Sequence, residues 1–254
     1  CLIKLMVKIV MTLIPDGKKG VEDPGSPIYL DENIISQPAA ALQLVAKEIF
    51  RMSDQVRDIL KKTIELVKNE EVKSIDGLKE NGEQVERLGK CITEYLAALF
   101  SSGSLTEQQA AQTASLMCVL SDVERMGTLS VEMAECMLER SDRKYKYTPE
   151  AMDELQKSLK VLNKMFCDSL KALQGDDGIE PGKMMKRKDK LLDLDIKMRK
   201  AHIERVNKGK CKASLTAPFT NILHLIDRMG NSCINLADVA ESGTSMKYFM
   251  LEEK

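Results

Sequence analysis

The sequence predicts an all-α protein built from two tandem, antiparallel three-helix bundles. Aromatic residues make up only 4% of the 254 residues and Trp is absent, which is untypical of a protein rich in β-strands. Apolar residues recur at spacings of three and four along six stretches, which is the period of amphipathic helices. Short polar segments separate these stretches, as the loops of a helical bundle do.

Four of the six expected helices have recognisable signals near one end. The first starts at Pro38, because a missing N–H is tolerated in the first turn. Thr106 and Gln109 form a capping-box pattern before the third helix, and Thr148 caps the fourth. Gly209 lies just past the fifth, as a C-terminal glycine would. We expect helices at about residues 38–67, 75–101, 106–141, 148–170, 184–206 and 218–239.

The third and sixth helices indicate an internal repeat. Ser104-Leu105-Thr106 before the third matches Ser214-Leu215-Thr216 before the sixth. A marked acid follows in each copy, about seven residues sooner in the second, and seven residues are about two helical turns. A duplicated three-helix unit explains a deletion that keeps the same helix face. The expected division is a lead-in and linker at 1–35, bundles at 36–142 and 146–242, and a tail at 243–254.

The lead-in is apolar but charged. Residues 1–14 carry Lys4 and Lys8, so this stretch is too short and too charged to span a membrane alone. No small-residue cleavage site follows it, which argues against a signal peptide. The pattern predicts an amphipathic helix or the tail of a longer one, and the lack of an initial Met fits a fragment of something larger. Residues 15–27, rich in Gly and Pro, predict a linker.

Charge and cysteine usage exclude several classes of function. A formal net charge of −1 gives no basic face for nucleic acid, so no nucleic-acid partner is expected. The seven cysteines are odd in number and contain no C-x-x-C, which argues against a disulfide framework or a zinc site. We expect reduced, mostly buried thiols in a cytosolic setting, including five in the helical stretches: Cys91, Cys118, Cys136, Cys167 and Cys233.

Two similar runs mark the third and sixth helices. They are Glu124-Arg125-Met126-Gly127-Thr128 and Asp227-Arg228-Met229-Gly230-Asn231. Each places an acid and a polar residue four positions apart, on one helix face, where the two could hold a metal ion. A similar run on the second helix, Glu86-Arg87-Leu88-Gly89 followed by Lys90, is interpreted as a chance match.

The duplicated runs resemble those of the PhoU family, whose two three-helix bundles each carry an E/D-R-x-G-D run. The front of the chain resembles the junction in bacterial sodium/phosphate cotransporters between the last membrane helices and a cytoplasmic PhoU-like domain. The residues that carry this second resemblance are Ile3–Val10 with Leu13-Ile14-Pro15, Tyr29-Leu30-Asp31-Glu32 and Ala46–Met52.

The resemblance implies a site but not an intact one. In metal-binding PhoU proteins, both the first acid and the Asp four residues later are ligands of iron or zinc clusters. Here the second acid is replaced by neutral Thr128 and Asn231, which bind hard cations more weakly. No cofactor is therefore expected, and weak Fe or Zn binding at Glu124, Thr128, Asp227 and Asn231 stays open. The plainer alternative is that each acid pairs with a neighbouring basic residue on a polar helix face.

The resemblance further implies a non-enzymatic regulatory domain of a sodium-dependent phosphate transporter, on the cytoplasmic side of the cell membrane. Its partner would be the membrane transport domain of the same or another protein. Two alternatives remain: a stand-alone PhoU-type adaptor that joins a phosphate transporter to a sensor kinase, and a metalloenzyme built in the bundle. The oligomeric state is open, a homo-oligomer included.

Other chemically prominent side chains are given structural roles. No catalytic residue is expected, and His202 and His224 are interpreted as structural or surface residues because no E-x-x-H pattern accompanies them. The basic run in 183–190 is expected to be a solvated helix start. Methionines at core spacing are expected to fill the interior: Met126, Met133, Met137, Met165 and Met229.

Overall fold

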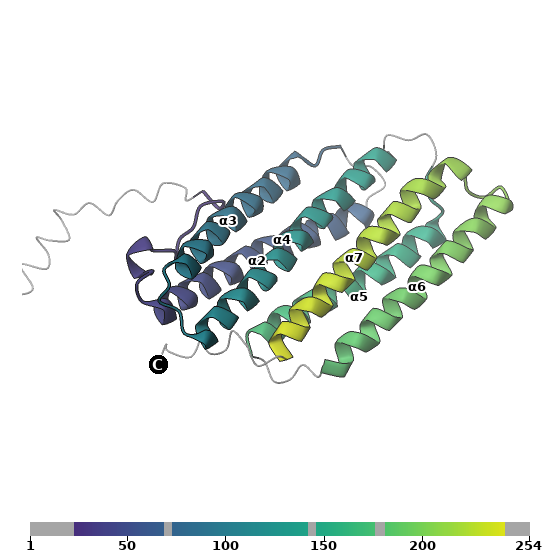
Figure 1. The fold of residues 1–254 in the computed structure, drawn as a ribbon. Helices are drawn as coiled ribbons and strands as arrows, with labels where there is room; N and C mark the ends of the chain where they lie inside the picture. Colours follow the sequence, from purple (N-terminus) through teal and green to yellow (C-terminus); the bar gives the residue numbers. More distant parts are fainter. Residues whose placement is uncertain (1–22, 69–72, 142–145, 176–180, 242–254) are drawn as a thin grey trace, which may run out of the picture.

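The computed structural model describes residues 23–68, 73–141, 146–175 and 181–241, and all regular structure in them is helical. Six long helices lie side by side, as Figure 1 shows. They are α2 (Pro38–Lys68), α3 (Asp76–Ser101), α4 (Glu107–Ser141), α5 (Pro149–Leu173), α6 (Pro181–Asn207) and α7 (Thr216–Glu241), with short 3₁₀ turns η1 (Glu32–Ile34) and η2 (Ala213–Leu215). The expected lead-in at 1–14 and tail at 243–254 fall outside the described residues.

The end signals act as the sequence predicts. The Thr106 N–H donates to Gln109 Oε1 at 3.0 Å, and the Gln109 N–H donates back to Thr106 Oγ1 at 3.3 Å. Thr148 Oγ1 accepts from the Ala151 N–H at 3.3 Å at the start of α5. Gly209, with φ of 68°, closes α6 in the left-handed conformation that glycine adopts without strain. The predicted capping box, N-cap and C-terminal glycine are therefore confirmed.

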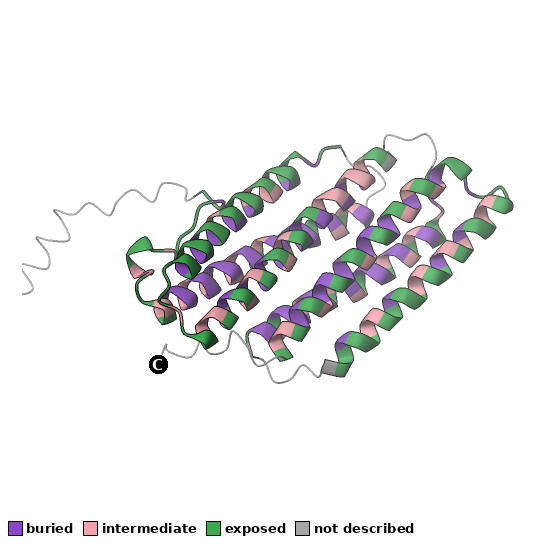
Figure 2. Cartoon of the chain, in the orientation of Figure 1, coloured by how far each residue is buried: buried purple, intermediate pink, exposed green. Residues whose placement is uncertain are grey.

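The helices form two three-helix bundles that share one core. Helices α2, α3 and α4 pack on one another, as do α5, α6 and α7. The bundles meet where α2 lies on α5 and α4 lies on α7, which leaves α3 and α6 on the outside (Figure 1). Buried residues line the inner faces along the whole length, as Figure 2 shows in purple. The predicted fold class is confirmed, whereas the limits 36–142 and 146–242 stay a prediction.

Before α2, the chain is held against the first bundle by a buried carboxylate. Residues 23–35, which we call the strap, run along α2 and α3. Glu48 on α2 is fully buried, and its Oε2 accepts from the backbone N–H of Ile28 at 2.9 Å and of Tyr29 at 2.7 Å. Arg51 donates to the Glu48 carboxylate and, at 2.7 Å, to the Ser26 carbonyl. Part of the expected linker is thus fixed in place.

Burial corrects two expectations and confirms a third. The five core methionines are all 0% exposed, as expected. The six described cysteines are free, but of the five expected to be mostly buried only Cys233 is, and Cys118 is exposed. In the basic run, Arg187 pairs with Asp168 and Lys188 with Asp227, so neither is part of a freely solvated helix start. Both lie on α6 where it faces a neighbouring helix, which the run of charges did not reveal.

No helix in the described part of the chain is both long enough and apolar enough to cross a membrane.

Candidate functional site

The two marked acids do not share a site. Helices α4 and α7 run antiparallel: Asn235 Nδ2 donates to Asp122 Oδ1 at 3.2 Å, and Arg228 lies 3.7 Å from Glu132. Asp227 is therefore about level with Glu132, which lies eight residues or roughly 12 Å along α4 from Glu124. Instead, Glu124 faces α3 and Asp227 faces α6, the second helix of each bundle in chain order.

In the second bundle, the acid is neutralised by the chain itself. Lys188 Nζ on α6 donates to Asp227 Oδ1 at 2.6 Å and to the Asp227 carbonyl at 3.0 Å. The Lys188 side chain is only 18% exposed, so this ion pair is shielded more than a surface pair. Gly230 makes room for it, because a Cβ there would lie 3.3 Å from Lys188 Nζ. Asn231 Nδ2 is 3.5 Å from Asp227 Oδ2, a marginal contact. The plainer alternative is confirmed for Asp227.

In the first bundle, the corresponding position opposite the acid is a glycine. Gly89 on α3 is buried against the Glu124 carboxylate, and a Cβ there would lie 3.2 Å from Glu124 Oε2. Among described residues no basic side chain pairs with Glu124, and the neighbouring charge that acts on its carboxyl is that of Glu86. Burial, together with the Glu86 charge, raises the pKa of Glu124 above its usual value. The expected ion pair is therefore wrong for Glu124, because the residue across from it has no side chain.

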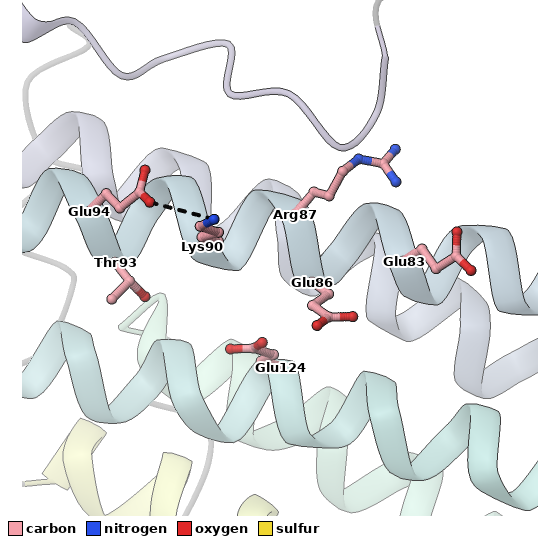
Figure 3. A pocket seen from close by; sticks show the side chains of 7 residues that line it. All are labelled: Glu83, Glu86, Arg87, Lys90, Thr93, Glu94 and Glu124. Carbon is pink, nitrogen blue, oxygen red and sulfur yellow. Dashed lines mark ion pairs between the residues drawn. The ribbon is translucent and has the colours of Figure 1, made fainter.

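A groove lies above this glycine, between α3 and α4. It has a volume of about 710 Å³, and Figure 3 shows Glu86 and Glu124 turned toward one another across it. Its lining residues are Glu83, Glu86, Arg87, Lys90, Thr93, Glu94 and Glu124.

Neither cation of the groove pairs with Glu86 or Glu124 in the described part of the chain. Lys90 lies 4.0 Å from Glu94, and Arg87 turns outward to Asp23 on the strap, at 3.3 Å. This leaves Glu86 and Glu124 facing one another without a basic partner among the described side chains. Two uncompensated carboxylates in a partly buried groove attract cations and repel anions.

The polar member of the first run contributes nothing to the groove. Thr128 is exposed, and its hydroxyl donates to the Glu124 backbone carbonyl at 3.3 Å within the same helix. Nowhere in the described ranges do three or more His, Cys, Asp or Glu side chains converge as metal ligands would. Of the four predicted site residues, Glu124 thus faces an open acidic groove and Asp227 faces a lysine. Thr128 and Asn231 each contact the acid of their own run.

Glu86 was not predicted from the sequence as a residue of the groove, although its E-R-x-G run was recognised. Its run, Glu86-Arg87-Leu88-Gly89, packs against the start of the run at Glu124, so it contributes to the groove whether or not its likeness to the other two runs is a chance match. The glycines of both runs allow close helix approach: a Cβ on Gly127 would lie 3.3 Å from Val56.

The histidines take the structural roles expected of them. His202 is 2% exposed, stacks on Phe219 at 4.6 Å between ring centroids, and has Nε2 3.1 Å from Thr216 Oγ1. Burial, with Arg205 nearby, lowers the pKa of His202. His224 is exposed on α7, and neither histidine lines the groove.

Comparison with known proteins finds one matching domain family and one similar curated protein. Residues 49–137, from α2 through α4, match the PhoU domain. A curated relative from Thermotoga maritima, the phosphate-specific transport system accessory protein PhoU homolog 1, is 24% identical over 209 residues. The similarity covers 81% of this chain and 88% of that protein, so it includes both bundles and not only the matched domain.

Proposed function

We propose that this chain is a PhoU-type regulatory protein that acts on a phosphate transport system without catalysing a reaction itself. The observation that carries the proposal is the similarity to a phosphate-transport accessory protein over 88% of that protein's length, together with the PhoU domain match at 49–137. The duplicated bundles and their marked acids, one on α4 and one on α7, agree with it.

The groove supports charge recognition. Glu86 and Glu124 stand on two rigid, packed helices, so their separation is fixed by the core and not by a loop. Such a pair suits reversible cation binding, by which the surface charge of α3 and α4 changes without a change of fold. In this proposal the protein docks on the cytoplasmic side of the transporter's membrane portion and the groove tunes that contact.

A second candidate is the same bundle pair as a covalently attached domain of a sodium-dependent phosphate transporter. The resemblance of the front of the chain to a transporter junction supports it, and the strap that Glu48 and Arg51 hold is the described segment between that front and α2. The two candidates differ in what is encoded before Cys1. Membrane spans in the same reading frame select the attached domain, and a separate reading frame selects the stand-alone protein.

Uptake of radiolabelled phosphate tests the proposal. A host strain lacking the gene is compared with the same strain complemented by the wild-type gene. We expect deletion to change uptake under phosphate-replete conditions several-fold and the wild-type gene to restore it. Uptake and phosphate content that do not respond to the deletion would refute a role in phosphate transport.

A further inference from the structure

The outer face of α6 carries an apolar stripe that no part of the described chain covers. Its members are roughly half exposed or more: Met185 (53%), Leu192 (51%), Ile196 (57%) and Ile203 (56%). Their spacings of seven, four and seven place them on one face of the helix. The stripe spans about 27 Å of α6, whose other faces pack chiefly on α5 and α7. Figure 2 shows exposed segments along the length of α6.

Two charged residues complete the stripe and give it an internal symmetry. Asp189 lies between Met185 and Leu192, and Arg199 lies between Ile196 and Ile203, so all six positions follow alternating spacings of four and three. That is the spacing of a coiled-coil seam. Read from either end, the stripe has the same order of apolar and charged positions, but the sign of the charge is reversed.

We propose that this stripe is the contact through which two copies of this chain pair, α6 against α6, antiparallel about a two-fold axis. In that arrangement Leu192 meets Ile196 of the partner subunit, and Met185 meets the partner's Ile203. Asp189 then lies opposite the partner's Arg199, and the symmetry makes this pair twice. A parallel arrangement would place like charges opposite one another.

The ion pairs within one chain leave both Asp189 and Arg199 able to pair with a second copy. Asp189 is exposed and has no ion pair to a described residue, whereas Arg199 Nε donates to Asp195 Oδ2 at 2.8 Å. A guanidinium has five N–H donors in a fixed fork, so Arg199 can keep Asp195 and still receive the partner's Asp189.

A second copy fits the stripe better than a lipid surface does. A bilayer would take Asp189 out of water without a partner and Arg199 with only Asp195, and anionic headgroups would repel Asp189. A second copy supplies each with its opposite charge. A single helix pair forms a small interface, below about 1,200 Å², so the dimer is expected to have a dissociation constant in the micromolar range. The inference does not depend on the proposed function.

Sedimentation of the full chain across a concentration series tests the pairing. We expect a monomer–dimer equilibrium that Leu192→Glu abolishes, because it places a carboxylate at the centre of the seam. Phe100→Asp is the matched control: Phe100 is 56% exposed on α3, away from the stripe, and its substitution should leave the dimer unchanged. Circular dichroism confirms that each variant keeps its helix content. A wild-type chain that stays monomeric at about 100 µM, well above the expected dissociation constant, overturns the proposal.

Charge exchange tests the direction of the helices. Asp189→Arg and Arg199→Asp should each weaken the dimer at least several-fold, because like charges then meet across the seam. An equimolar mixture of the two variants should restore wild-type association, since each mixed dimer regains two opposite-charge pairs. No recovery in the mixture overturns the antiparallel pairing. Binding of a monomeric chain to vesicles of phosphatidylserine and phosphatidylcholine, lost in Leu192→Glu, would overturn it in favour of a membrane contact.

Discussion

Replacing Glu48 with alanine should release the strap and destabilise the whole protein. The substitution removes a fully buried carboxylate that accepts from the N–H groups of Ile28 and Tyr29 and from Arg51. Because the Arg51 side chain is only 18% exposed, its charge stays partly shielded from water after the carboxylate is gone.

The structure gives a rough magnitude for this loss. Removing one partner of a buried ion pair costs about 3–5 kcal/mol. Arg51 keeps its contacts to the Pro24 carbonyl at 3.1 Å and the Ser26 carbonyl at 2.7 Å, so the lower end applies, about 3 kcal/mol. With a urea dependence of about 3 kcal/mol per molar, the unfolding midpoint should fall by about 1 M.

Two measurements check this prediction. Urea unfolding gives the loss of stability, and amide hydrogen exchange reports the strap directly at Ile28 and Tyr29, whose N–H groups lose their acceptor. Glu65→Ala is the matched control, because Glu65 is exposed on the same helix. If Glu48→Ala behaves like the control, or if exchange at Ile28 and Tyr29 stays slow, the carboxylate does not hold the strap.

The remaining predictions concern the groove. Glu124→Gln should raise the free energy of unfolding at pH 7 by less than about 1 kcal/mol, because the side chain is partly exposed. Because the pKa of Glu124 is raised in the folded state, its ionised carboxylate destabilises the protein only as the pH rises from about 4.5 through that folded-state pKa. Thermal unfolding of Glu124→Gln should therefore show a gain in stability at pH 7 and none well below pH 4.5. A gain that is independent of pH would contradict this. Thr128→Asp should increase the uptake of iron or zinc, measured by elemental analysis of the purified protein. Asn231→Asp should increase it less, because Lys188 already forms an ion pair with Asp227. Equal metal uptake in both variants would show that this ion pair does not hinder metal binding.

Helix positions were predictable because each depends on residues close in sequence. The three-and-four spacing, the Thr106 and Thr148 caps and Gly209 all act within one or two turns, and all appear where expected. The buried methionines follow from the same periodicity. The two-bundle fold then follows, since six amphipathic helices joined by short loops must bury their apolar faces against one another.

The site was only half predictable because it depends on residues that face each other across helices. Glu124 and Asp227 look equivalent in the sequence, yet one meets Gly89 and the other Lys188. Spacing along one helix does not reveal which residue of the neighbouring helix lies opposite. Glu48 was missed for the same reason: in the sequence it lies among the charged residues of an amphipathic helix, and the strap residues that donate to it lie 19 and 20 positions earlier.

The shared core has a consequence for how the protein is made. The face of α4 that α7 covers, including Ser130, whose Oγ lies 3.8 Å from Met229 Sδ, stays bare until the last helix has left the ribosome. The end of α7 comes 100 residues after the end of α4 (241 − 141), so at about 5–20 residues per second that surface waits for about 5–20 s. A nascent chain in this interval presents an apolar helix face to its surroundings, and early termination before α7 leaves it so permanently. We therefore expect chaperone dependence and aggregation to fall most heavily on chains that lack the final helix.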